Sequence, residues 1–86
     1  MDAAAVERTI RRRLRRRREA LGLTLPELAG RTGLTVQRVQ GFEQGPVSIS
    51  AATLMRLARA LDIDVDYFFE GLARGSADRS ARPVTA

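Results

Sequence analysis

The sequence lacks several residue types, and each absence removes a class of chemistry. There is no cysteine, which excludes disulfides and thiolate catalysis, and no histidine, the commonest general base and a frequent metal ligand. Apolar runs extend over a few residues, far short of the roughly 20 that a membrane-spanning helix requires. No signal peptide is recognisable either. We therefore expect a cytoplasmic protein that is no enzyme, with no metal, no cofactor, no evident small-molecule ligand and no membrane partner.

Lysine is also absent, so all 15 basic residues are arginine, against 10 acidic residues and a net charge of +5. Residues 1–45 hold ten arginines and five acids, whereas residues 46–86 hold five of each, so the entire excess lies in the first half. A basic half beside a neutral half favours a surface for a polyanion. The alternative is a charged helix that only faces solvent. With 86 residues the chain is long enough for one small domain.

Hydrophobic periodicity predicts an α-helix over residues 3–21. Arginines fill most of the circumference of this segment, and Gly22 follows it as a typical helix-ending residue. Steps of four, four and seven place the apolar residues on one face, which carries Val6, Ile10, Leu14 and Leu21.

Capping residues predict four further helices. Thr24 and Glu27 form a capping-box pattern, and Thr35, Ser50 and Asp64 precede apolar stripes as N-caps. No β pattern appears, so the expected fold class is all-α. The helices are expected over residues 25–32, 35–44, 51–61 and 65–70. Together with the first helix they form a compact five-helix domain over residues 1–71, and the polar, aperiodic residues 72–86 are expected to be a disordered tail.

The second and third expected helices, joined through Gly33, have the spacing of a helix-turn-helix. Spacing alone is of moderate specificity, because any helical bundle contains two helices and a turn. The residues from Ile10 to Gly71 resemble the lambda-repressor-like (XRE) helix-turn-helix family in three stretches, "REALGLTLPELAGRTGL", "TVQRVQGFEQG" and "LMRLARALDIDVDYFFEG". The resemblance implies a five-helix DNA-binding domain whose third helix enters the major groove. It also implies a transcriptional regulator, often dimeric, of the bacterial or phage type and associated with the nucleoid.

Two positions follow from the resemblance. Arg18 and Glu43 match a family pair that braces the first helix against the third, and the arginine also lies near a phosphate. The family often has glutamine at the first position of the second helix, where it contacts a phosphate; here that residue is Leu25. A side-chain phosphate contact at that position is therefore in doubt.

On a helical wheel Val39 and Phe42 point to one side of the third helix, and the opposite side is polar. A glutamine amide matches the edge of adenine and an arginine fork matches guanine, so this side suits the major groove. The alternative is a solvated glutamine face. Gly41 costs about 1 kcal/mol relative to alanine in a helix interior; either it allows close approach to DNA, or tertiary packing tolerates it. The candidates for base contacts are Gln37, Arg38, Gln40 and Gly41.

A second set of residues is expected to contact phosphates and position the domain without specifying sequence. Not every arginine between Arg11 and Arg18 can face DNA, so two or three are expected to reach phosphates, and the others solubilise the helix or approach a second subunit. The phosphate candidates are Arg17, Arg18, Arg31, Thr35, Gln44 and Ser48.

These observations favour a sequence-specific regulator, more often a repressor, that binds double-stranded DNA as a homodimer. The alternative is a protein-interaction module, such as an antitoxin or the adaptor of a larger regulatory complex, with a protein partner. A membrane-surface role for the first helix is disfavoured, because its apolar face has no tryptophan or phenylalanine.

Overall fold

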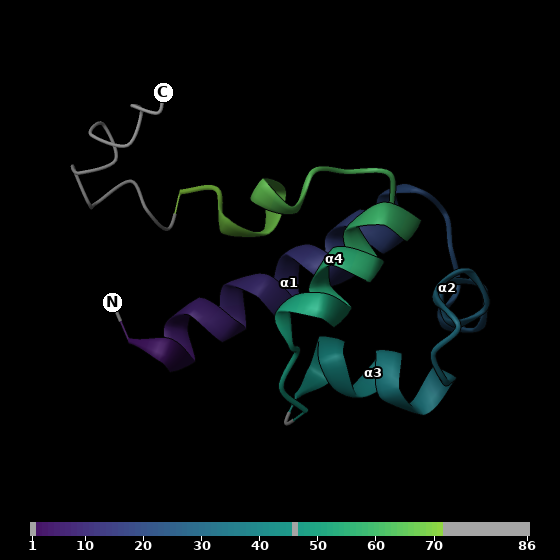
Figure 1. The fold of residues 1–86 in the computed structure, drawn as a ribbon, viewed down its shortest axis with the longest axis horizontal. Coiled ribbons are helices and arrows are strands. Elements are labelled where there is room, and N and C mark those ends of the chain that lie inside the picture. Colours follow the sequence, from purple (N-terminus) through teal and green to yellow (C-terminus); the bar gives the residue numbers. More distant parts are fainter. Residues whose placement is uncertain (1, 46, 72–86) are drawn as a thin grey trace.

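The structure, a computed structural model, describes residues 2–45 and 47–71. Four α-helices occur in these residues: α1 (Ala3–Ala20), α2 (Leu25–Thr32), α3 (Val36–Gln44) and α4 (Ala51–Ala60). A 3₁₀ helix, η1 (Val65–Phe69), follows them, and the described part of the chain contains no strand. In Figure 1, α1 runs behind α4, α3 lies below both, and α2 closes the end remote from the N-terminus. Each helix begins and ends within one residue of the range expected from the sequence.

The last helix differs from the expectation of five α-helices, because it is a single 3₁₀ turn. The amide of Tyr67 donates to the carbonyl of Asp64, three residues earlier, at 3.0 Å. The side chain of Asp64 accepts from the amide of Asp66 at 2.9 Å, and Gly71 leaves the turn with a φ of +85°. This segment is too short for an α-helical ladder, and the tighter turn suffices to bury Phe68. The tail expected at residues 72–86 lies outside the described residues.

One hydrophobic core joins all five elements. Among the described residues, each element contributes at least one side chain with almost no exposed surface. Leu21 was expected on the buried face of α1, but it follows the last helical residue and is 40% exposed. The largest fully buried side chains are Leu14, Leu28, Val39, Phe42, Leu57, Leu61 and Phe68.

Arginines of α1 attach the helix to the carboxyl ends of other elements. The guanidinium of Arg13 donates to the carbonyl of Tyr67 in η1 at 2.9 Å, and Arg17 donates to the carbonyl of Leu61, just after α4, at 3.0 Å. Unsatisfied carbonyls at a helix end are good acceptors for cations. α1 contains eight arginines, and no helix in the described ranges is long and apolar enough to cross a bilayer.

Candidate nucleic-acid interface

Local structure fixes both ends of α2, with a capping box at its start and a left-handed glycine at its end. At its start, the Thr24 hydroxyl accepts from the Glu27 amide at 3.1 Å, and the Glu27 carboxylate accepts from the Thr24 amide at 2.8 Å. Two interactions with Thr24 lower the pKa of the Glu27 carboxyl. The hydrogen bond from the Thr24 amide has the larger effect, and the interaction with the Thr24 side chain has the smaller one. At the other end, Gly33 takes the left-handed conformation with φ +76°, which allows the chain to turn directly into α3. The two helices are therefore held as a helix-turn-helix.

α3 presents a polar outer face on two buried anchors. Val39 and Phe42 are fully buried, whereas the side chains on the opposite side are open to solvent. Thr35 caps the helix by accepting from the amide of Arg38 at 3.1 Å. The outward face carries Gln37, Arg38, Gln40 and Gln44, all exposed.

Arg38 has one further contact that restricts its position. Its guanidinium carbon lies 5.4 Å from the centroid of the Phe42 ring, one helical turn later. Cation–π contact at this distance contributes about 0.5–1 kcal/mol at an exposed site. The three glutamine side chains of the outer face make no hydrogen bond among the residues described here, so their amides remain available to a ligand.

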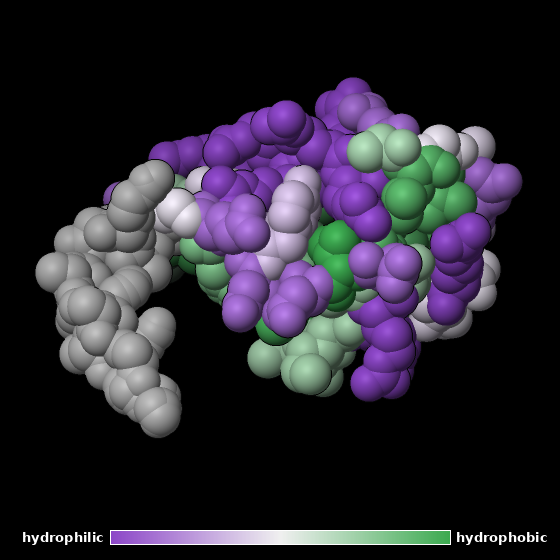
Figure 2. Space-filling model, turned by 90° about the horizontal axis from the view of Figure 1, so that it is seen from above, coloured by the Kyte–Doolittle hydropathy of each residue, from purple (hydrophilic) through white to green (hydrophobic). Residues whose placement is uncertain are grey.

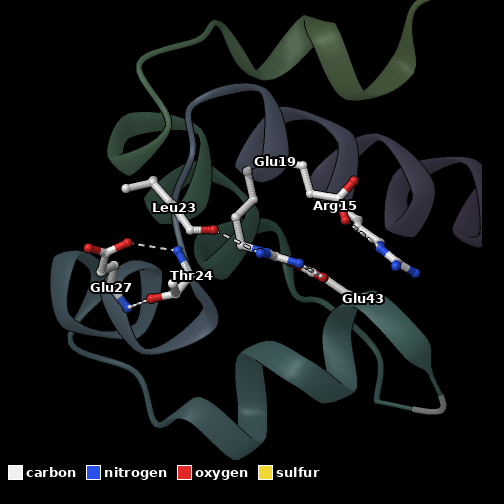
Figure 3. A network of polar contacts seen from close by, with 7 residues as sticks. Arg15, Glu19, Leu23, Thr24, Glu27 and Glu43 are labelled. Carbon is white, nitrogen blue, oxygen red and sulfur yellow. Dashed lines mark hydrogen bonds and ion pairs between the residues drawn. The ribbon is translucent and has the colours of Figure 1, made fainter.

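A buried ion pair sets the position of α3 against α1 (Figure 3). Nε and Nη2 of Arg18 donate to the two carboxylate oxygens of Glu43 at 2.7 and 3.0 Å, while Nη1 donates to the carbonyl of Leu23 at 2.8 Å. Both side chains are largely shielded, with 12% and 4% of their surface exposed. The hydrogen bond with Glu43 raises the pKa of Arg18, while its partial burial acts in the opposite direction. The structure thus contains the pair that the family resemblance implies, and this bonding occupies the Arg18 guanidinium.

Sequence reasoning missed Arg11, which binds the carboxyl end of α3. Its Nη1 donates to the carbonyls of Phe42 at 3.1 Å and Val47 at 2.8 Å, and its Nη2 pairs with Glu7 at 3.0 Å. Arg11 precedes Arg18 by seven residues, which is two helical turns, so both lie on the side of α1 that faces α3. That spacing was the signal available in the sequence.

Gly41 is explained by a contact inside the protein. A Cβ added at this position would lie 2.7 Å from Cγ2 and 3.3 Å from Cβ of Val47. Carbon atoms attract at about 3.5–4.0 Å and repel strongly at shorter separation, so a side chain at position 41 would force Val47 to move. The contact with DNA expected at Gly41 stays a prediction, since this packing accounts for the glycine by itself.

The expected phosphate-contacting residues do not all gather around α3. Thr35 and Gln44 lie at the two ends of α3, and Ser48 lies in the loop that follows it, all exposed. Arg17 and Arg31 instead point to the carboxyl end of α4, where Arg17 donates to the carbonyl of Leu61 at 3.0 Å and Arg31 donates to that of Ala60 at 3.5 Å. The first three therefore border the polar face, and the two arginines are engaged elsewhere.

Known proteins are similar to this chain in sequence and in the arrangement of their helices. The sequence pattern of the helix-turn-helix family (HTH_3) matches residues 14–68. An uncharacterised transcriptional regulator in the ATPase CF(0) region of Rhodospirillum rubrum is 43% identical over 70 residues, which cover 81% of this chain and 65% of that protein. An uncharacterised HTH-type transcriptional regulator of Rickettsia conorii is 44% identical over 55 residues, covering 64% of this chain and 44% of that protein. The matched region thus spans less than two thirds of these relatives.

A solved structure has the same fold. The crystal structure of the restriction-modification controller protein C.AhdI from Aeromonas hydrophila superposes with a TM-score of 0.71 and 36% sequence identity. The similarity covers 77% of this chain and 98% of that one, so it includes the turn between α2 and α3 and the core beneath it. From the family pattern, the relatives and the geometry of α2 and α3 together, we conclude that the chain belongs to the lambda-repressor-like helix-turn-helix family.

Proposed function

We propose that the protein is a sequence-specific regulator of transcription that binds double-stranded DNA with α3 in the major groove. The observation that carries this proposal is the polar face of α3, on which Gln37, Arg38 and Gln40 stand free of internal hydrogen bonds on a rigidly held helix. Amide and guanidinium groups match the donor and acceptor patterns of adenine and guanine edges. The first turn of α3 is the part of a recognition helix that comes closest to bases in related motifs. The exposed hydroxyls of Thr35, the N-cap of α3, and of Ser48, in the loop after α3, border this face and suit phosphates.

The proposal extends to a homodimer that acts as a repressor. Apolar side chains are exposed on the side of the molecule formed by α4 and η1, where Met55 is 56% and Phe69 38% exposed. Met55, Ile63 and Val65 line a shallow hollow there together with Arg59 and Asp64, which offers both apolar and charged groups for a two-fold contact. Analytical ultracentrifugation of the wild type and of Met55→Asp tests this contact. A wild type that stays monomeric at about 100 μM, a hundred times a dissociation constant of about 1 μM, contradicts it.

The experiment for DNA recognition is selection of bound sites from a random duplex pool, followed by footprinting. A palindromic consensus with half-sites about one helical turn apart is expected. Replacing Gln37 or Arg38 by alanine is expected to relax preference at one base position by about 1–3 kcal/mol. Binding that shows no preference over random DNA at about 150 mM salt refutes sequence-specific recognition, because the electrostatic affinity for phosphates is the same for every sequence and is weakened at this salt concentration. A reporter gene placed behind the selected site then gives the sign of regulation, for which we propose repression.

A further inference from the structure

The arginines of α1 fall into groups with different surroundings. Four of them are engaged with the rest of the protein: Arg11 and Arg18 bind α3 and its neighbourhood, and Arg13 and Arg17 bind the carbonyls near η1 and α4. Arg15 forms an exposed ion pair with Glu19 at 3.0 Å. The remaining three, at every fourth position, are exposed and make neither a hydrogen bond nor an ion pair within the described residues. We call these three, Arg8, Arg12 and Arg16, the outer arginine row.

The outer arginine row points away from α3. Arg11 and Arg18 mark the side of α1 that faces α3, and at 3.6 residues per turn the centre of the row lies about 120° around the helix from them. The row is also nearly opposite Leu14, the fully buried residue of α1. Hydrophilic side chains accordingly gather along the edge of the molecule formed by α1 in the view from above (Figure 2). The row and the polar face of α3 are therefore separate surfaces.

The chemistry of the row suits a phosphate backbone. Steps of four residues separate its guanidiniums by about 6 Å along the helix, so the row spans about 12 Å. A duplex strand presents one phosphate per about 3.4 Å of axis, that is, three to four phosphates over this length. Guanidinium binds phosphate with two parallel hydrogen bonds, which an ammonium group cannot form in the same geometry.

Other macromolecules fit the row less well. The centre of a protein interface is depleted in charge and contains large apolar or aromatic side chains, and this face of α1 carries arginines with no large apolar or aromatic residue among them. Single-stranded nucleic acid is bound largely by stacking on aromatic rings, and no aromatic residue occurs in α1. Insertion into a membrane surface requires apolar residues beside the basic ones. Of these classes of partner, double-stranded DNA is the one that can be bound by guanidinium groups without apolar or aromatic neighbours.

We propose that the outer arginine row is a second DNA-binding surface, which holds the backbone of a separate duplex segment without regard to its sequence. The molecule measures 40 × 25 × 22 Å, and a straight duplex beneath α3 does not reach a face about 120° around α1. DNA has a persistence length of about 150 base pairs, so a short duplex does not bend around the domain unaided. The second segment is consequently another molecule or a distant part of the same one, and the protein joins the two.

The test uses the full chain and two charge-matched variants. The duplex found by selection is immobilised and saturated with protein, and a fluorescent random duplex of about 30 base pairs, well below the persistence length, is then added. Arg12→Gln together with Arg16→Gln removes two guanidiniums from the row. Arg56→Gln together with Arg59→Gln removes the same charge from α4 and serves as the control. Because Arg56 donates to the carbonyl of Thr32 at 3.5 Å and Arg59 lines the hollow beside Met55, the unfolding and the sedimentation of this variant are first matched to those of the wild type.

The wild type and the α4 control are expected to capture the random duplex, and the row variant to lose capture about tenfold at low salt while still binding the immobilised site. For random duplex bound alone, the slope of log affinity against log salt is expected to fall by about 1.8 in the row variant, at about 0.9 per lost phosphate contact. Equal capture by both variants would show that the row only faces solvent or that a second α3 joins the duplexes. Absence of capture by the wild type, or equal displacement by polyglutamate and DNA, also overturns the proposal.

This inference and the proposed function fail in different ways. If selection yields no preferred site, sequence-specific recognition by α3 is refuted, but the salt slopes of the two variants on random duplex still measure the row. If a site is found and capture does not depend on Arg12 and Arg16, the row is refuted and recognition by α3 stands.

Discussion

The packing of Gly41 against Val47 gives a prediction in which two opposite effects can be separated. Alanine at position 41 stabilises the α-helix by about 1 kcal/mol relative to glycine, because it restricts the unfolded chain and shields the backbone. Its Cβ, however, would lie 2.7 Å from Cγ2 of Val47. Forcing an extra methyl group into an occupied space costs about 1–3 kcal/mol. Gly41→Ala is therefore expected to leave stability unchanged or to lower it by up to about 2 kcal/mol.

Val47→Ala removes the methyl groups that collide. Only the Cβ of residue 47 then remains close to a Cβ at position 41, at 3.3 Å. In that background Gly41→Ala is expected to stabilise the protein by about 0.5–1 kcal/mol, close to the full propensity difference. The coupling between the two substitutions, measured by urea denaturation followed by circular dichroism, should then lie between about 0.5 and 3 kcal/mol. A Gly41→Ala variant that is stabilised equally in both backgrounds would refute the steric explanation.

The same double variant also distinguishes the two roles of Gly41. If glycine is present only because of Val47, the double variant keeps the DNA affinity of Val47→Ala. A large loss of affinity in the double variant, with its fold intact, would show that a Cβ at position 41 also collides with DNA. The comparison with Val47→Ala is the control, since it contains every change except the Cβ on α3.

Three further predictions concern the frame around α3. Glu43→Gln leaves the shielded guanidinium of Arg18 without its anion and is expected to lower the free energy of unfolding by about 3–5 kcal/mol, measured by denaturation; a loss below about 1 kcal/mol would mean that the pair behaves like a surface ion pair. Asp62 has a φ of +56° just after α4, where Gly22 has +71° after α1, so Asp62→Gly is expected to raise the free energy of unfolding by about 0.5–1 kcal/mol, measured by denaturation, with Asp62→Asn separating charge from conformation. The pKa of Glu27 is lowered in the folded protein, so the ionised carboxylate stabilises the fold above the ordinary carboxyl pKa, and this contribution disappears as the pH falls through the lowered value. Glu27→Gln should therefore make the free energy of unfolding depend less on pH between neutral and acidic conditions than in the wild type. Parallel plots of this free energy against pH for the two proteins would contradict the assignment.

Local features of the sequence predicted the helices well, because the residues that determine them are adjacent in the chain. Thr24, Thr35, Ser50 and Asp64 all cap helices as expected, each through its side chain. The 3₁₀ character of η1 was not predicted, since a segment of this length has too few periodic residues to distinguish the two helix types. The outward direction of the α3 glutamines followed from the spacing of Val39 and Phe42.

The partners of the arginines could not be predicted from the sequence. Arg13 and Arg17 bind carbonyls 54 and 44 residues away, and every residue has a carbonyl, so no side-chain pattern identifies the acceptor. The periodicity of α1 could have separated Arg11 and Arg18 from the outer arginine row, but this division was not predicted. The reason for Gly41 lies in the path of the loop through Val47, which is set by tertiary packing and not by helix propensity.

The bonds that hold α3 have a consequence for how specificity can change. Apart from its hydrophobic anchors, α3 is fixed by Glu43 and by backbone carbonyls that Arg11 binds, and carbonyls are the same whatever side chain a residue carries. Gln37 and Gln40 contribute nothing to this attachment among the described residues. Gln37 and Gln40 can thus be replaced without removing a contact that holds α3 in place. If α3 recognises bases as proposed, variants with new binding sites can be built on one unchanged scaffold.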